Sequence, residues 1–343
     1  MMQKTIIIIG GGPAGIEAAA RLVQNAYKVI LIEKENEIGG HIKNTYKLFP
    51  NFEDSSAIID SFNSKIKHEN IDIHLNTEIE TIKKEDNQWI AVSKCGQTWT
   101  SDAMIIASGF RLFNPVYKEE LGYGMYKGVI TSVEFEEMYK KGQILNSDGT
   151  MPKRIAFLNC VGSRDEKVGN YYCSRVCCIN AVKLAIEAKE IMPESEVFCF
   201  YMDIRMSGQF YEELYRKSQE KYNVNYIRGR ISEASQTIDN KIQIKAEDTL
   251  SRLPLKMTVD MLVLMIGIES SDSTTNLASQ LGIAGEYGFA KSMGLFLNDN
   301  KTKHEGLFLA GVCKRPLTLP ETMADGRAAA LACLEYLNNI NKN

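Results

Sequence analysis

The sequence lacks any long apolar run and any large excess of one charge. None of its apolar stretches approaches the roughly 20 residues that a membrane-spanning helix needs. The net charge is only −3 over 343 residues, which argues against bulk attraction to nucleic acid or to an anionic membrane. With 44% hydrophobic and 24% charged residues, the chain has the composition of a globular protein, and its length suits two domains.

Signals of secretion and of a disulfide framework are also missing. The chain passes from Lys4 directly into the apolar run Ile6–Ile9, with no cleavage-type segment before it. Several of the eight cysteines have no evident partner, which is typical of a reducing compartment. We therefore expect a cytoplasmic protein with no membrane span and no nucleic-acid partner.

One glycine-rich turn has the sequence context of a dinucleotide site. A strand is predicted over residues 5–9, a helix over 16–25 and a second strand over 28–32, which ends at Glu33. Between the first strand and the helix lies G-G-G-P-A-G, residues 10–15. Strand, glycines, helix, strand and acid together favour a nucleotide-binding βαβ unit over an ordinary glycine turn.

Each part of this turn has a physical role. Gly10 allows the tight turn, Gly12 lets the backbone approach a pyrophosphate, and Gly15 permits close packing of helix on strand. The helix N-terminus offers N–H groups to the phosphates. Glu33 is placed to accept hydrogen bonds from the adenosine ribose.

Further segments resemble flavoproteins that bind two dinucleotides. The double glycine after Glu33, the Ser108-Gly109 turn and residues 306–313 match places where that family contacts FAD. The family's A-G-D triplet gives an Asp to the ribityl chain, but Val312 stands in that position, which leaves this contact to the backbone. The resemblance implies FAD contacts at Gly10, Gly12, Pro13, Ala14, Gly15, Glu33, Lys34, Gly39, Gly40, His41, Ala107, Ser108, Gly109, Gly311 and Val312.

The C-terminal part offers one candidate for tuning the flavin. A helix is predicted over residues 320–337, and its N-terminus would favour an anionic reduced flavin. Lys314 precedes this helix and is the candidate catalytic group, with an ordinary surface charge as the alternative.

The second part of the chain has a cysteine pattern where a second glycine fingerprint is expected. The predicted strand 154–158 is followed by Cys160, Cys173, Cys177 and Cys178 in the spacing C-x12-C-x3-C-C. Four thiolates suit an iron–sulfur cluster. Structural zinc remains an alternative, although adjacent cysteines fit it poorly, and so do redox-active or simply buried thiols. The other four cysteines are expected to be core residues or to have no catalytic role: Cys95, Cys199, Cys313 and Cys333.

Residues 156–227 keep a βαβαβ layout, which predicts a second Rossmann-like domain whose nucleotide pocket has been changed. Its arginines, at positions 164, 175, 205, 228 and 230, either form a solvated surface, or some of them flank the anionic thiolate cluster or dock an acidic redox partner. We predict an α/β fold of two Rossmann-like domains with a discontinuous FAD domain. The expected segments are 1–112 and 253–343 for the FAD domain, 113–152 for a crossover, and 153–252 for the second domain with its iron–sulfur loop.

The cysteine block, the F-Y-M-D-I-R stretch at 200–205 and the flavoprotein frame resemble the A subunit of heterodisulfide reductase. The resemblance implies FAD and a [4Fe-4S] cluster held by Cys160, Cys173, Cys177 and Cys178. The long methanogen form has additional ferredoxin-like segments that are absent from these 343 residues. The chain is therefore similar to the short A subunits of sulfur-oxidising heterodisulfide-reductase-like complexes, or to those of a quinone-interacting oxidoreductase complex.

This resemblance implies an electron-transfer subunit that works in the cytoplasm as a homodimer. Its partners would be iron–sulfur proteins like the B and C subunits of heterodisulfide reductase. Two other hypotheses remain: a stand-alone flavin disulfide reductase, which the absence of C-x-x-C spacing disfavours, and a scaffold with a structural flavin.

Overall fold

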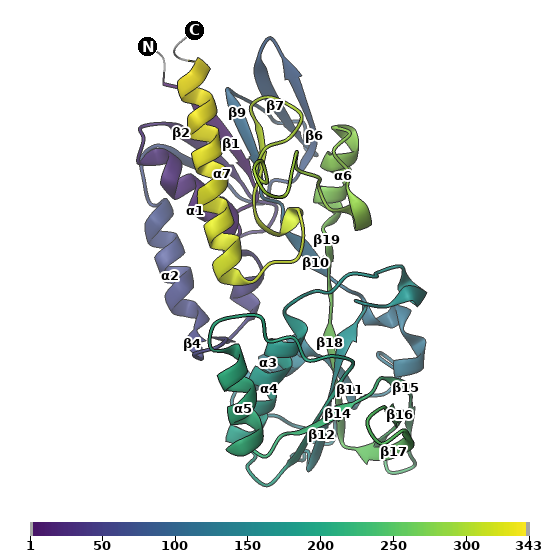
Figure 1. Ribbon diagram of the computed structural model, residues 1–343. Helices are drawn as coiled ribbons and strands as arrows, with labels where there is room; N and C mark the ends of the chain where they lie inside the picture. Colours follow the sequence, from purple (N-terminus) through teal and green to yellow (C-terminus); the bar gives the residue numbers. More distant parts are fainter. Residues whose placement is uncertain (1–2, 341–343) are drawn as a thin grey trace. The chain divides into compact units, whose positions relative to one another are not determined.

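The computed structural model describes residues 3–340 and forms two compact units, which are drawn in Figure 1. Within the described residues, unit 1 comprises 3–43, 56–111 and 269–340, and unit 2 comprises 44–55 and 112–268. Each unit contains its own five-stranded parallel sheet. The predicted α/β class with two Rossmann-like domains, the first of them discontinuous, is confirmed.

The sheet of unit 1 has the strand order β20-β9-β1-β2-β5. Its strands are β1 (Thr5–Ile9), β2 (Lys28–Ile32), β5 (Ile71–His74), β9 (Ala103–Ile106) and β20 (Leu307–Leu309). Strands β2 and β9 lie on opposite sides of β1, so the chain changes direction across the sheet at the end of β1. Ligands of open parallel sheets bind at such a switch point.

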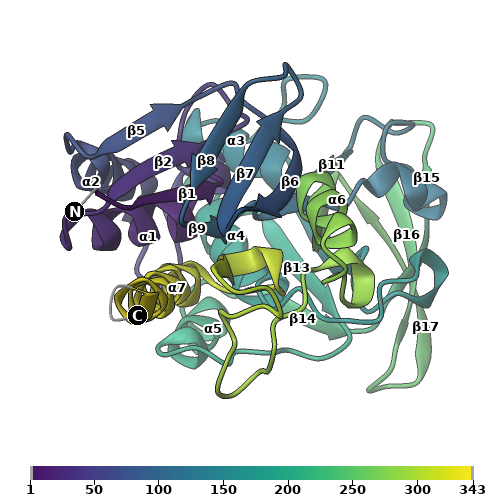
Figure 2. The ribbon, with the colours of Figure 1, turned by 90° about the horizontal axis from the view of Figure 1, so that it is seen from above.

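Strand β1 is buried on both faces because different elements cover each one. Ile6 and Ile8 share a core with α1 (Pro13–Val23) and α7 (Leu319–Ile340). Ile7 and Ile9 belong to a second core, which includes α6 (Asp272–Gln280) and the antiparallel sheet of β6 (Ile79–Glu85), β7 (Gln88–Ser93) and β8 (Thr98–Ser101). Figures 1 and 2 show α1, in purple, beside α7, in yellow. Helix α2 (Ser55–Ile66) contributes a smaller apolar cluster.

The sheet of unit 2 has the strand order β11-β18-β12-β13-β14. Its strands are β11 (Val129–Thr131), β12 (Arg154–Val161), β13 (Glu196–Tyr201), β14 (Asn225–Arg228) and β18 (Met261–Ile266). One core contains residues of α3 (Ser132–Lys140) and α4 (Cys177–Ile191), and α5 (Tyr211–Glu220) packs on α4. A separate core joins the sheet to antiparallel strands β15 (Ile231–Gln236), β16 (Ile242–Asp248) and β17 (Leu253–Val259).

The unit boundaries differ from the expected segments in three places. Residues 44–55 lie in unit 2 and contain the two-stranded sheet of β3 (Lys47–Leu48) and β4 (Glu53–Asp54). The expected crossover 113–152 contains β11 and α3. The chain returns to unit 1 at Glu269 rather than at 253, because β17 pairs with β16 and β18 with β12.

Two short strands, β10 (Phe110–Leu112) and β19 (Ile268–Ser270), pair where the chain passes between the units. Short 3-10 helices span Gly40–Asn44 (η1), Pro115–Tyr117 (η2), Glu119–Leu121 (η3), Glu166–Val168 (η4), Glu286–Gly288 (η5) and Gly311–Cys313 (η6). No helix within residues 3–340 is long and apolar enough to span a membrane.

Candidate functional site

The turn between β1 and α1 has geometry that requires glycine at two positions. Gly10 has a φ of +113°, and a Cβ there would overlap the Ala107 carbonyl oxygen. A Cβ at Gly15 would overlap the Gly10 carbonyl oxygen. The start of α1 therefore packs directly against the ends of β1 and β9.

Gly12 and the first turn of α1 form a cradle that is open to a ligand. A Cβ added at Gly12 would meet no atom within 4 Å. Gly12 is the N-cap of α1, no side chain caps this helix, and its first turn contains Pro13 and no acidic residue. The positive end of the helix dipole is thus left for an anion. The residues present therefore fit the pyrophosphate of a dinucleotide.

Glu33 lies beside this cradle at the end of β2. The Gly11 amide donates to Glu33 Oε2 at 2.6 Å, and the Glu35 amide donates to Glu33 Oε1 at 2.9 Å. Glu33 is only 7% exposed. A carboxylate has roughly four acceptor positions, so each oxygen of Glu33 keeps one for a ligand such as a ribose diol.

The double glycine after Glu33 packs on the same turn. The Gly39 amide donates to the Gly11 carbonyl oxygen at 2.8 Å. Gly40 has a φ of +60°, and a Cβ there would lie 3.3 Å from the Gly12 Cα. The structure therefore brings residues 39–40 against the glycine turn, as expected of backbone that passes along the cofactor.

His41 and Lys34, both predicted to contact FAD, differ in exposure: His41 is partly buried, whereas Lys34 is exposed. The His41 ring stacks on Phe110 with centroids 4.1 Å apart, and its Nε2 lies 2.9 Å from the Phe110 carbonyl oxygen. Burial lowers the pKa of His41, and this hydrogen bond partly opposes the shift. The Lys34 side chain is 52% exposed and pairs with Glu35 at 3.6 Å.

The hydroxyl group of Ser108, shortly after the end of β9, makes its hydrogen bond within the protein. Ser108 Oγ lies 2.7 Å from Thr274 Oγ1, and the Ser271 hydroxyl donates to the Ser108 carbonyl oxygen at 3.0 Å. These bonds hold the start of α6 at the end of β9. Gly109 follows with a φ of +65°, and the space above its Cα is open.

The turn after β20 also packs on the cradle. Gly311 has a φ of +75°, and a Cβ there would lie 2.7 Å from the Ala14 Cβ. Val312 is 5% exposed and has no polar side-chain atom, so only its backbone could contact a cofactor by hydrogen bonding.

Lys314 is buried, and its ammonium group donates three hydrogen bonds within the protein. Its side chain is 2% exposed, and Nζ donates to Asp299 Oδ2 at 2.8 Å, to the Asp299 carbonyl oxygen at 3.0 Å and to Asp325 Oδ1 at 2.8 Å. Asp325 was not among the residues predicted from the sequence. The flavin-tuning role of Lys314 stays a prediction.

In unit 2, Cys160 lies at an irregular point of β12. The pairing of β12 with β18 shifts register between Leu158 and Val161, and Cys160 has a φ of +62°. A bulge of this kind changes the direction of a side chain and is often found near functional sites. The next residue but one, Gly162, has a φ of +77° and packs so closely on Phe113 that a Cβ would overlap the ring.

The loop that returns to α4 is held by specific hydrogen bonds. The Ile268 amide donates to Ser174 Oγ at 2.8 Å, and the Tyr172 hydroxyl donates to the Ile268 carbonyl oxygen at 2.7 Å. The Asn170 side chain donates to the Gly162 carbonyl oxygen at 2.9 Å. The loop therefore has a defined path that presents Cys173 shortly before the helix.

Cys177 and Cys178 are the first two residues of α4. Burial raises the pKa of Cys160 to about 12, and the nearby Cys178 and Cys173 thiols add to this shift. Burial also raises the pKa of Cys177, which the other three thiols raise further. The four thiols therefore lie near enough to influence one another, with Cys160, Cys177 and Cys178 buried and Cys173 partly exposed.

Within residues 3–340, the structure contains no group of three or more His, Cys, Asp or Glu side chains placed to hold a metal ion. The donor set nevertheless fits an iron–sulfur cluster, because sulfur is the ligand that such clusters take. Polar atoms near Cys160 also lack partners: both side-chain atoms of Asn159, Ser163 Oγ and Arg164 Nη1 are buried without a hydrogen bond. Such groups are expected to find a partner in the complete protein, and the sulfides of a cluster can accept hydrogen bonds.

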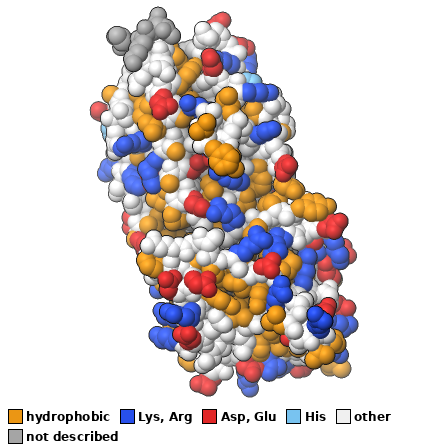
Figure 3. Space-filling view, in the orientation of Figure 1, with side chains coloured by type: hydrophobic (Ala, Val, Ile, Leu, Met, Phe, Trp, Pro, Cys, Tyr) orange, Lys and Arg blue, Asp and Glu red, His pale blue; other side chains and the backbone are white. Residues whose placement is uncertain are grey.

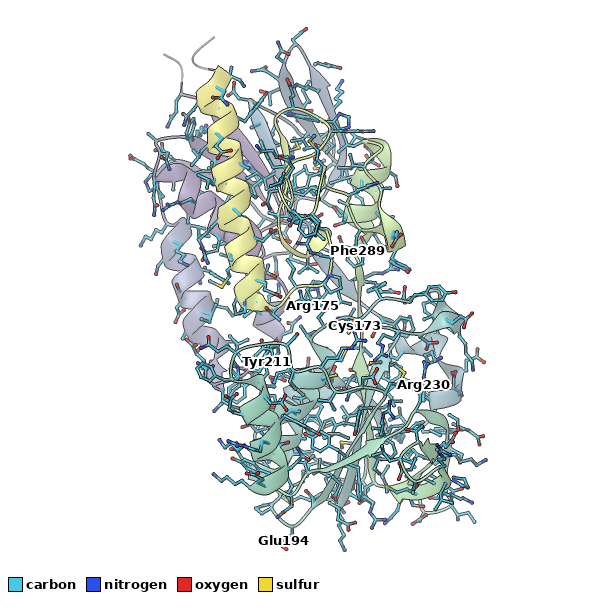
Figure 4. The ribbon with its side chains drawn as sticks, in the orientation of Figure 1. Cys173, Arg175, Glu194, Tyr211, Arg230 and Phe289 are labelled. Atoms are coloured by element: carbon cyan, nitrogen blue, oxygen red, sulfur yellow. The ribbon has the colours of Figure 1, made fainter. Side chains whose placement is uncertain are left out.

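The arginines of unit 2 are largely paired. Arg164 and Arg228 contact Asp203 at 2.7 and 3.5 Å, and Arg230 pairs with Asp165. Arg164 and Arg230 also lower the pKa of Cys160, against the larger effect of burial. Figure 4 labels Cys173, Arg175 and Arg230, and Figure 3 shows acidic and basic side chains interspersed on the visible face of this unit. Both interpretations of these arginines, a solvated surface and a flank of the cluster, stay open.

Comparison with known proteins identifies relatives over nearly the whole chain. Residues 4–328 match the model of a pyridine nucleotide-disulphide oxidoreductase family. The A subunit of the H(2)/formate:CoB-CoM heterodisulfide,ferredoxin reductase of Methanococcus maripaludis is 31% identical over 96% of this chain and 64% of its own length. The iron-sulfur A subunit of the CoB–CoM heterodisulfide reductase of Methanocaldococcus jannaschii has the same identity and coverage. The chain thus spans a little under two-thirds of the length of these relatives.

Solved structures support the fold. Thioredoxin reductase from Lactococcus lactis superposes with a TM-score of 0.71 at 16% identity, over 98% of this chain and 100% of its own. The enzyme from T. acidophilum gives 0.69 at 18% identity, over the same shares. The thioredoxin-reductase-like fold and the resemblance to the A subunit of heterodisulfide reductase, both predicted from the sequence, are confirmed. Together with the open cradle at Gly12, these findings support FAD as the cofactor, and the chain belongs to the pyridine nucleotide-disulphide oxidoreductase family of flavoprotein oxidoreductases.

Proposed function

We propose that this chain is the FAD- and [4Fe-4S]-containing electron-transfer component of a heterodisulfide-reductase-like complex in sulfur metabolism. FAD, when bound, exchanges electrons in pairs, and the cluster passes them one at a time to an iron–sulfur partner protein. The observation that carries the proposal is the junction of β12 and α4. There, three buried thiols and the partly exposed Cys173 lie near enough to raise one another's pKa, at the place where a thioredoxin-reductase-like chain would have its second nucleotide turn.

The residues of unit 1 would hold the flavin nucleotide. The open space at Gly12 and the uncapped start of α1 would take the pyrophosphate, and Glu33 would bind the adenosine ribose. Residues 39–41, 107–109 and 311–312 would line the rest of the cofactor. These roles follow from the contacts of the glycine turn and from the family resemblance.

The residues of unit 2 would hold the cluster through Cys160, Cys173, Cys177 and Cys178. The Arg175 amide already donates to Cys173 Sγ at 3.3 Å, and Cys178 Sγ lies 3.6 Å from the Asp203 carbonyl oxygen. Hydrogen bonds from N–H groups to ligand sulfur favour the reduced cluster, because they stabilise added negative charge. The unpartnered donors of Asn159 and Arg164 would act in the same direction.

The partners follow from the names of the relatives. The relatives are named as A subunits of their reductases, which supports association with other subunits, and we propose that these are iron–sulfur proteins like the B and C subunits of a heterodisulfide reductase. We also propose that the chain is cytoplasmic and forms a homodimer within such a complex.

The decisive experiment is anaerobic purification of the full chain, followed by iron, sulfide and flavin quantitation. We expect one FAD and about four iron and four sulfide ions per chain. Cys177→Ala should lose iron and keep FAD. Cys199→Ala is the matched control, since this cysteine is buried in the same apolar core as Cys177 but lies on β13, outside the four-cysteine pattern, and it should keep both cofactors.

Three results would contradict the proposal. Full FAD occupancy without iron, even after anaerobic reconstitution, would show that the chain does not bind the proposed cluster. Zinc in place of iron would make the site structural. Sustained NADH-driven reduction of disulfides by the isolated chain would favour a stand-alone reductase instead.

A further inference from the structure

Two carboxylates flank the glycine turn of unit 1, and the sequence pointed to only one of them. Glu33 follows β2, whereas Asp325 lies on α7 beside the turn that follows β20. In the sheet order β20-β9-β1-β2-β5, these two strands lie on opposite sides of β1. The start of α1, at the end of β1, is therefore between a carboxylate on one side and a carboxylate on the other.

Both carboxylates are fixed by the amide of a glycine. The Gly11 amide donates to Glu33 Oε2 at 2.6 Å, and the Gly311 amide donates to Asp325 Oδ2 at 2.5 Å. Each glycine is next to the nucleotide cradle, because Gly11 precedes the Gly12 N-cap and Gly311 packs on Ala14. Helix α7 also approaches closely, since a Cβ at Gly326 would overlap the Ala14 backbone.

The remaining hydrogen bonds of Asp325 can be counted. Its Oδ1 accepts from Lys314 Nζ at 2.8 Å and from the Asn300 side chain at 3.0 Å. Its Oδ2 accepts only from Gly311 among the bonds of the described residues. With roughly two acceptor positions on each oxygen, Oδ1 is full and Oδ2 keeps one. The side chain is 13% exposed, so this position can be reached from outside.

The covalent order of FAD matches this arrangement. Its pyrophosphate joins two polyols, the ribose of adenosine and the ribityl chain that carries the flavin. If the pyrophosphate lies at the start of α1 and Glu33 takes the ribose, the other polyol extends toward Gly311. We propose that Asp325 Oδ2 accepts a hydrogen bond from a ribityl hydroxyl of FAD, and so supplies from α7 the carboxylate that Val312 cannot.

Lys314 then acts as a positioning residue for this contact. Its buried ammonium group bridges Asp325 and Asp299, and Arg315 fixes Asp299 through two hydrogen bonds of 2.8 and 2.7 Å. The two cations and two carboxylates balance in charge. This network holds the Asp325 carboxylate in one orientation, with Lys314 and Asn300 on Oδ1 and Gly311 on Oδ2.

The test compares two ligands with the flavin-free full chain. FAD has both polyols, whereas ADP has only the ribose, so a ribityl contact affects FAD alone. For Asp325→Asn we expect the Kd of FAD to rise about tenfold or more, as for the loss of a bond to a charged acceptor, and the Kd of ADP to change less than about threefold. Glu33→Gln is the matched control and should weaken both ligands.

Asp299→Asn separates a direct contact from an effect through Lys314. It removes the other carboxylate of the network but leaves the Gly311–Asp325 bond, so FAD should bind more tightly to it than to Asp325→Asn. Equal loss of FAD and ADP affinity in Asp325→Asn, or unchanged FAD affinity, would overturn the proposal. If Asp325→Asn fails to fold, wild-type protein can be titrated with ribityl-deoxygenated FAD analogues. Full affinity for every one of them would likewise overturn it. These titrations need no iron, so their outcome is independent of the cluster.

Discussion

The buried carboxylate Glu187 gives the sharpest prediction about stability. It lies on α4, is 0% exposed, and neither of its oxygens has a hydrogen bond. The nearest cation, Lys183, is 3.6 Å away, but its ammonium group donates to Glu136 at 2.7 and 2.5 Å and to the Lys47 carbonyl oxygen at 2.8 Å. Among the described residues, Glu187 therefore has only this longer contact with Lys183 to offset its burial. Burial raises its pKa from 4.5 to about 8; Lys183 opposes this shift, and Glu136 adds to it.

The sign of the pH dependence follows from this shift. An acid with a raised pKa in the folded state holds its proton more tightly there than in the unfolded chain. The stability that Glu187 contributes is therefore fully present below about pH 4.5 and is lost as the pH rises to about 8. The free energy of unfolding should fall by about 1.36 kcal/mol per pH unit within this window. The total loss is on the order of 5 kcal/mol, and above pH 8 the slope from this group vanishes.

Glu187→Gln should remove this slope, because the amide does not titrate. Relative to the wild type, the variant should therefore gain stability steadily as the pH is raised from 5 to 8. Glu213→Gln is the matched control: it removes an exposed carboxylate of unit 2 on α5, one that does not contribute to the pKa shift of Glu187, and it should keep the wild-type slope.

The assay must report on unit 2 alone. Both tryptophans, Trp89 and Trp99, lie in unit 1, so their fluorescence does not follow α4. Cys199 is fully buried in the core of unit 2, and pulsed thiol labelling in urea, read by peptide mass spectrometry, gives the unfolding midpoint of this unit. Equal slopes for wild type and Glu187→Gln between pH 5 and 8 would refute the reasoning.

Three further outcomes follow from the contacts described above. Lys183→Met should lower the free energy of unfolding by about 3–5 kcal/mol, since it leaves a buried carboxylate unpaired, and the same labelling assay measures this. Gly15→Ala should destabilise even the flavin-free protein through backbone overlap, whereas Gly12→Ala, with open space at its Cβ, should keep flavin-free stability and lose FAD affinity. Thermal melts and FAD titrations distinguish the two. Arg164→Gln should lower the reduction potential of the cluster by on the order of tens of millivolts by removing a nearby positive charge. EPR-monitored titration would show this, with the exposed Lys167→Gln unchanged.

The first βαβ unit could be predicted from the sequence because its constraints are local. Strands β1 and β2 begin and end at the predicted residues, since glycine requirements and an unbroken apolar run define them without reference to the rest of the chain. Helix α1 begins earlier than predicted because Pro13 suits the first turn of a helix. Helix α4 begins at Cys177 after Val176, whose side chain makes no capping hydrogen bond, so its start has no capping signal in the sequence.

Other elements carried a usable signal that the sequence analysis missed. Thr131 and Glu134 form a capping box at the start of α3, and the pattern T-x-x-E is visible in the sequence. It would have placed a helix in the expected crossover. By contrast, the return to unit 1 at Glu269 depends on which strands pair with β17 and β18. Pairing between strands of similar apolar pattern is a property of the whole fold.

The bulge at Cys160 could not be derived from sequence either. A left-handed backbone at a cysteine costs energy that only the surrounding contacts can supply, and here these include the close packing of Gly162 on Phe113. The spacing of the four cysteines predicted that they converge. The same spacing suits a loop that returns at the start of a helix, which is where Cys177 and Cys178 lie, but it did not predict that Cys160 lies within the strand instead of after it.

Asp325 shows why a motif can miss a functional group that the fold retains. The A-G-D pattern is read at contiguous positions, so Val312 suggests that no carboxylate is present. However, the turn at Gly311 packs on the start of α1, and α7 approaches the same place. Because residue 326 is a glycine, this helix comes close enough for Asp325 to accept a hydrogen bond from the Gly311 amide. The requirement at this point is for an acceptor at one position in space. A helix that crosses the cradle can meet this requirement as well as the turn itself, provided that the charge on Asp325 is balanced, as it is by Lys314.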